Sequence, residues 1–88
     1  MSEPEKIKEY AACLMSIADI AALIGADADH LQSKIADRTT DISKSYYLGK
    51  AETTYAIRSR EVELAKAGSP LAVELTGDYL IEQSQHEL

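Results

Sequence analysis

The stretch from Ser16 to Asp27 has the sequence SIADIAALIGAD, and it decides the fold. Between Ile17 and Ile24, apolar side chains recur three or four positions apart, which is the spacing of one helix face. Ser16 is a favourable N-cap for this segment, and Gly25 is suited to the left-handed conformation that ends many helices. Since Asp27 can cap another helix, the stretch predicts two short helices joined by a tight turn.

The segments on both sides of this stretch have the same helical periodicity. Apolar residues predict a first helix over 5–14, and a helix over 28–36 in which Leu31 and Ile35 point inward. No segment has the alternating pattern of a strand. The sequence therefore predicts an all-α fold, with a helix-turn-helix bundle at the N-terminus.

The second half of the chain is divided by the sequence Gly68-Ser69-Pro70. A glycine can end a helix, a serine can cap the next one, and proline is favoured at the first helical position. This punctuation predicts a long helix over 41–67 and a shorter C-terminal helix over 70–83. In that last helix we expect Leu71, Leu75, Tyr79 and Leu80 to face the body of the domain.

The length of 88 residues fits one domain. We expect residues 1–88 to form it, with the helix-turn-helix part over 5–40 and the long and C-terminal helices over 41–83. No segment approaches the roughly 20 apolar residues of a membrane span or has the pattern of a secretory signal. The single cysteine, Cys13, cannot form an intrachain disulfide. We expect Cys13 to be buried, and the protein to be cytoplasmic and not bound to a membrane.

The sequence has no group of residues in a pattern typical of a catalytic site. It has two histidines and one cysteine without metal-ligand spacing, and it has neither a glycine-rich phosphate loop nor a nucleophile elbow. Asp27 and Asp29 lack the calcium-binding loop that would surround them in an EF-hand, and helix capping accounts for both. We therefore expect no enzyme activity, no metal and no cofactor.

The net charge of −6 is unevenly distributed along the chain. Residues 1–41 and residues 68–88 each carry a net charge of −4, whereas residues 42–67 carry +2. Affinity for nucleic acid comes largely from lysine and arginine on phosphate. A phosphate-binding surface is therefore expected mostly in the middle third of the chain.

The long helix has apolar residues on two opposite sides when its positions are plotted at 100° per residue. Ile42, Tyr46 and Gly49 lie on the first side, together with Ala56, Ile57 and Leu64. One side can pack on the chain's own helices, and the other is most simply covered by a neighbouring subunit. A helix of this length must also project from a small domain or break at Gly49. The predicted oligomer interface consists of Tyr47, Leu48, Ala51, Tyr55 and Val62.

In a DNA-binding helix-turn-helix, the second helix enters the major groove with its early residues. Gln32 and Lys34 suit contacts with bases or phosphates, whereas Asp27, Asp29 and Asp37 oppose them. Basic residues along the following long helix can add phosphate contacts. The predicted DNA-binding residues are His30, Gln32, Ser33, Lys34, Arg38, Lys44, Lys50, Arg58 and Arg60.

Three segments in this order resemble the small terminase subunits of tailed bacteriophages and prophages. Asp19–Asp27, DIAALIGAD, is similar to the opening of their helix-turn-helix, and Ser45–Glu52, SYYLGKAE, to the start of their long helix. Ala65–Ala72, AKAGSPLA, is similar to the turn that follows. The resemblance covers residues 14–80, and the order of the three motifs is more specific than any one of them.

The resemblance implies a DNA-packaging adaptor that recognises double-stranded viral DNA, assembles into a homo-oligomer, and passes the DNA to a large terminase subunit with the ATPase and nuclease. The acidic helix over 28–36 departs from what DNA binding favours. An alternative is therefore a helix-turn-helix-derived protein-interaction module with an acidic face, or a transcription regulator.

Overall fold

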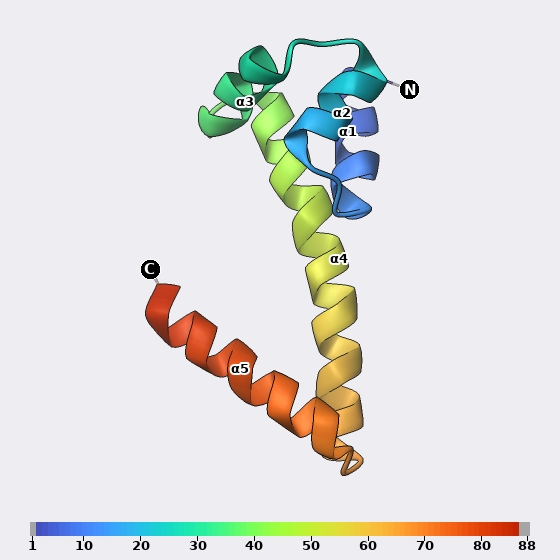
Figure 1. Cartoon of the computed structure of the whole chain (residues 1–88), viewed down its shortest axis with the longest axis vertical. Helices are drawn as coiled ribbons and strands as arrows, with labels where there is room; N and C mark the ends of the chain where they lie inside the picture. The colour runs from blue at the N-terminus through green and yellow to red at the C-terminus, as the bar shows by residue number, and fades with distance from the viewer. Residues whose placement is uncertain (1, 87–88) are drawn as a thin grey trace. The chain divides into compact units, whose positions relative to one another are not determined.

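The computed structural model describes residues 2–86, which form five helices and, within that range, no strand (Figure 1). The helices are α1 (Glu3–Ala12), α2 (Ile17–Ile24), α3 (Ala28–Ala36), α4 (Asp41–Lys66) and α5 (Pro70–His86). The predicted all-α fold, with a long helix followed by a shorter C-terminal one, is confirmed. In the described part of the chain, no helix is both long and apolar enough to cross a membrane.

Contacts divide the chain into two compact units, Met1–Thr54 and Tyr55–Leu88. We call them the N-terminal unit and the C-terminal unit. The boundary falls inside α4, whereas the sequence suggested a division ahead of this helix. The first half of α4 therefore completes the helix-turn-helix part, and its second half pairs with α5.

The core of the N-terminal unit is built from all four of its helices. Partly buried side chains such as Ile17, Ile24 and Ile42 pack around the core. Each helix contributes the face that its apolar spacing predicts, and burying a large aliphatic side chain stabilises the fold by about 1.5–3 kcal/mol. The buried residues are Ile7, Ala11, Ile20, Ala21, Leu31, Ile35 and Tyr46.

The turn between α2 and α3 has the predicted caps. The Ser16 hydroxyl accepts a hydrogen bond from the Asp19 amide at 3.1 Å at the start of α2. Gly25 ends the helix with φ of 74°, a left-handed conformation that glycine adopts at little cost. The Asp27 carboxylate accepts from the His30 amide at 3.0 Å and begins α3. These local bonds hold the two helices at a fixed turn.

Helix α1 lies two residues earlier than the predicted range of 5–14. The Ser2 hydroxyl accepts from the Glu5 amide at 3.3 Å and starts the helix there, with Pro4 in the first turn, where a missing amide hydrogen is tolerated. The helix ends at Ala12 because Leu14 adopts a left-handed conformation with φ of 60°.

The first half of α4 approaches α1 closely at Gly49. A Cβ atom there would collide with the Lys8 carbonyl oxygen, so a larger residue cannot be accommodated without a shift of backbone. One turn later, the Thr53 hydroxyl donates to the Ala12 carbonyl at the end of α1. On the other side, the buried Ser43 hydroxyl donates to the Ile35 carbonyl of α3 at 2.7 Å. Helix α4 is continuous through Gly49.

The C-terminal unit consists of the second half of α4, the turn at Gly68 and α5. As predicted, Ser69 caps α5 by accepting from the Ala72 amide at 3.4 Å. The predicted inward face of α5 is correct in part: Leu75 and Tyr79 are half-buried, whereas Leu71 and Leu80 are 67% and 65% exposed and Ala72 is buried. The prediction favoured the leucines because of their size, whereas the small side chain of Ala72 lets the two helices approach more closely.

Candidate functional site

The outer face of α3 presents the predicted recognition residues. His30, Gln32 and Ser33 are exposed, and Lys34 is half-buried. They lie outward because Leu31 and Ile35 of the same helix point into the core with exposures of 2% each. The polar face of α3 is thus held in place by the core beneath it.

Negative charge lies at both ends of this helix. Asp27 and Asp29 are exposed at its start and Asp37 is exposed at its end. The pKa of Asp37 is lowered, chiefly because the Thr39 hydroxyl donates to its carboxylate at 2.7 Å and secondarily because the Thr39 amide does so at 3.1 Å. Asp37 therefore stays ionised at neutral pH, and α3 itself is a poor source of affinity for phosphate.

The turn after α3 is tied down by hydrogen bonds to Thr40. Its hydroxyl donates to the Lys34 carbonyl at 2.8 Å and accepts from the Ser43 amide at 3.1 Å, so Thr40 caps α4. This turn positions Arg38, whose guanidinium carbon lies 3.7 Å from the centroid of the Tyr47 ring. The contact joins a residue predicted to bind DNA to one predicted to contact another subunit.

The first half of α4 carries two further predicted cations, Lys44 and Lys50, and both are exposed. The Lys50 ammonium lies 5.2 Å from the centroid of the Tyr46 ring and 3.5 Å from its hydroxyl. Tyr46 in turn meets Tyr47 edge to face, with ring centroids 5.1 Å apart. A basic and aromatic cluster therefore follows α3 directly; we define it as Arg38, Lys44, Tyr46, Tyr47 and Lys50.

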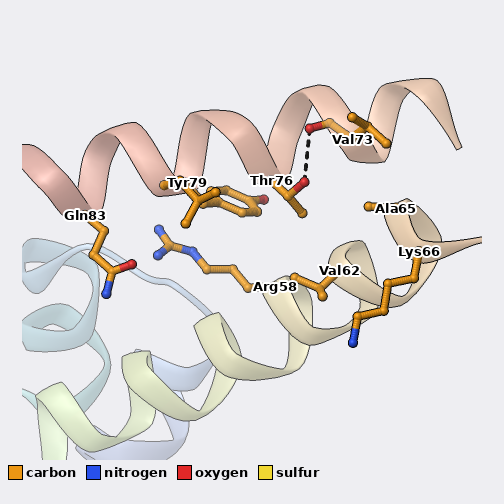
Figure 2. Close-up of a pocket in the computed structure, with 9 residues that line it drawn as sticks. Arg58, Val62, Ala65, Lys66, Val73, Thr76, Tyr79 and Gln83 are labelled. Carbon is orange, nitrogen blue, oxygen red and sulfur yellow. Dashed lines mark hydrogen bonds between the residues drawn. The ribbon is translucent and has the colours of Figure 1, made fainter. Parts of the chain in front are cut away.

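The other two predicted DNA contacts, Arg58 and Arg60, lie in the C-terminal unit. Arg60 is exposed. Arg58 is engaged within the unit, because its guanidinium donates to the Glu82 carboxylate at 3.2 Å and lies 4.5 Å from the Tyr79 ring centroid. Figure 2 shows Arg58 extending from α4 toward Tyr79 of α5. The Arg58 side chain thus links α4 to α5 within the hairpin.

A mostly apolar groove of about 570 Å³ runs between the two helices of the C-terminal unit (Figure 2). Both helices line it, with Val62 and Ala65 from α4 and Val73 and Tyr79 from α5. Thr76 lies at its edge with its hydroxyl bonded to carbonyls of its own helix. The hairpin thus leaves apolar surface accessible along its inner side as well as outside.

All five residues of the predicted oligomer interface are exposed. Tyr55 is 74% exposed and Tyr47 36%, the latter with Arg38 stacked on it. The structure adds large exposed side chains that the sequence interpretation did not include in the interface, among them Leu71 and Leu80, which it had placed inside. The further ones in the C-terminal unit are Ile57, Leu64, Val73 and Ile81.

Sequence reasoning missed the pairing of cations with tyrosines. The contact between Lys50 and Tyr46 could have been predicted from the sequence, since residues four apart on a helix are neighbours. The contact between Arg38 and Tyr47 has no such sequence pattern, because it depends on how the turn at Thr39 and Thr40 folds back.

The expectation that Cys13 is buried was wrong. Cys13 is exposed, because α1 ends just before it.

Within residues 2–86, no three histidine, cysteine or acidic side chains are grouped so that they could hold a metal ion. Comparison of the chain with family models, with curated proteins and with solved structures gives no match.

Proposed function

We propose that this protein is a non-catalytic, DNA-binding adaptor of the kind found in the small terminase subunits it resembles. The observation that carries the proposal is the α2–α3 pair, in which a left-handed turn at Gly25 and two core residues of α3 leave a polar face outward. The proposed role places the protein in a bacterial cytoplasm, with a large subunit that supplies ATPase and nuclease activity.

The distribution of charge suggests that different parts of the proposed interface contact the bases and the phosphates. The α3 face would read base edges, for which side chains such as Gln32 are suited. Phosphate contacts would come mainly from the basic and aromatic cluster, because Asp27, Asp29 and Asp37 surround α3 with negative charge. Such a monomer binds DNA weakly, and several copies on one duplex multiply the affinity.

The C-terminal unit supports self-association. Of its described residues only Ala72 is buried, while many large apolar side chains are exposed. Folded units below about 40 residues usually need a disulfide, a metal or a partner for stability. A second copy of this chain is the occupant we propose for the apolar surface of this unit.

The acidic character of α3 favours a second candidate function, a protein-interaction module that binds a basic partner. Asp29 lies among the outward residues of α3, and the chain as a whole has a net charge of −6. Such a module would share the fold and the oligomeric state of the DNA adaptor. It would differ in having no affinity for duplex DNA.

Titration of a fluorescent mixed-sequence duplex at two salt concentrations tests the proposed function. We expect binding at low salt that weakens steeply as salt rises, because cations on the protein displace counterions from phosphate. Lys34→Glu should weaken binding, whereas Lys6→Glu, an equal change of charge on exposed α1, should weaken it much less. An absence of binding at low salt would leave the protein-interaction module as the better account.

A further inference from the structure

Two arginines of this protein stack on tyrosine rings, and they differ in what their guanidinium groups bind. Arg58 stacks on Tyr79 and also donates to the Glu82 carboxylate, so its charge is compensated within the hairpin. Arg38 lies closer to its ring, 3.7 Å from the Tyr47 centroid, and it forms no ion pair with any described residue. Its hydrogen-bond donors remain available at the surface.

We infer that the Arg38 guanidinium binds a phosphate of the duplex DNA backbone, and that Tyr47 is the positioning residue that holds it for this contact. The inference rests on the proposed function and reassigns Tyr47, which the sequence placed in the subunit interface. A guanidinium presents two parallel N–H groups that match the oxygens of a phosphate. Stacking on a flat ring fixes that plane in advance, so less side-chain freedom is lost on binding.

Both parts of the protein that hold Arg38, the Tyr47 ring and the turn at Thr40, are fixed by contacts with the fold. The Tyr47 ring packs in a T-shaped arrangement with the ring of Tyr46, which is buried in the core at 7% exposure. On the other side, the turn that carries Arg38 is held by the two hydrogen bonds of Thr40 to α3 and α4. The exposed Arg38 side chain thus lies between two supports that are each held by the fold.

The electrostatic surroundings favour an anion. Lys44 and Lys50 are three residues before and after Tyr47, which makes them its neighbours on the helix surface. From Arg38 to Lys50 the chain has three cations and one carboxylate, Asp41, whereas the chain as a whole is acidic. Asp37, which precedes Arg38, adds a second carboxylate that accepts from the Thr39 hydroxyl and amide, so the stretch from Asp37 to Lys50 keeps a net charge of +1. A phosphate at Arg38 would also lie directly beyond the end of α3, where a groove-binding helix meets the backbone.

The inference is tested by titrating duplex DNA into the full-length protein and three variants over a range of salt. Arg38→Gln should weaken binding and reduce the slope of log affinity against log salt by about one, the value for one lost phosphate contact. Tyr47→Leu should weaken binding several-fold although it changes no charge, and Tyr47→Phe should bind like the parent because it keeps the ring. Lys6→Gln is the control for loss of one exposed positive charge outside the site.

Light scattering on the same samples separates the two roles of Tyr47. If Tyr47→Leu keeps the parent's mass and loses affinity, the inference is supported. If Tyr47→Leu dissociates the oligomer, or if Arg38→Gln binds as tightly as the parent, the inference is overturned. Should the parent bind no DNA, the proposed function fails by itself. NMR titration of the Arg38 side chain with inorganic phosphate then decides the anion site: a shift that Tyr47→Leu abolishes supports it, and no shift overturns it.

Discussion

Two helix ends in this protein, those of α1 and α4, use the same hydrogen-bond pattern, and α1 does so with an unfavourable residue. After α4, the Gly68 and Ser69 amides bond back to the carbonyls of Ala65 and Leu64, and Gly68 is left-handed with φ of 94°. After α1, Leu14 occupies the position that Gly68 takes there. A leucine in this conformation costs roughly 1–2 kcal/mol, because its Cβ crowds the following carbonyl.

We expect Leu14→Gly to stabilise the protein by up to about 1 kcal/mol, since relief of the crowding exceeds the added freedom of the unfolded chain. Little burial is lost, because Leu14 is 54% exposed. Urea unfolding followed by circular dichroism measures the change. Leu14→Ala is the matched control, which keeps a Cβ and should bring no gain. Destabilisation by glycine would mean that the leucine side chain contributes more than the strain removes.

Asp37 is a second residue whose local bonds have a measurable effect. Both hydrogen bonds from Thr39 favour the ionised form, so its pKa lies below the ordinary 3.8. Its contribution to stability is accordingly complete above the ordinary pKa and is lost as the pH falls through the lowered value. In an NMR titration, the Asp37 carboxyl should become protonated at a lower pH than an ordinary aspartate does. In Thr39→Val, which removes the hydroxyl, the pKa should rise, and an unchanged pKa would show that this bond does not form in solution.

Among the helices, the contact of α1 with α4 depends on one missing side chain. We expect Gly49→Ala to destabilise the N-terminal unit by about 1–3 kcal/mol, because the new methyl group meets the Lys8 backbone, which cannot turn aside as a side chain could. The readout is the midpoint and slope of a urea transition.

Gly77→Ala is the matched control for this substitution. Gly77 also lies within a helix, but a Cβ there meets nothing. Alanine has the higher helix propensity, by about 0.8–1 kcal/mol, so this variant should be as stable as the parent or more so. Equal behaviour of the two glycine variants would contradict the close packing of α4 on α1.

The helices themselves were predictable from local signals. Ser16, Gly25 and Asp27 each act within a few residues of their own position, so the sequence alone located the turn between α2 and α3. The inward face of α5 was only partly predicted, because it depends on which side meets α4, and size favoured Leu71 and Leu80 over Ala72. The stacking of Arg38 on Tyr47 could not be predicted, since the two are nine positions apart with a turn between them.

For the whole molecule, the proposed oligomer makes a prediction that DNA binding does not share. Tyr55, which is 74% exposed, lies in the predicted interface. Tyr55→Glu should shift the mass measured by light scattering toward the monomer, because a charge is costly to bury in an apolar contact. Gln32→Glu adds the same charge on α3 and should leave the mass unchanged. A parent protein that is already monomeric at tens of micromolar would refute the proposed assembly.

The exposed thiol of Cys13 gives that experiment both a precaution and a tool. Being the single cysteine of the chain, it can link two copies covalently under oxidising conditions, so masses are meaningful only with a reductant present. The same thiol accepts one maleimide dye per chain, at the end of α1. Counting the bleaching steps of single labelled particles then reports the number of subunits directly, without any engineered attachment site.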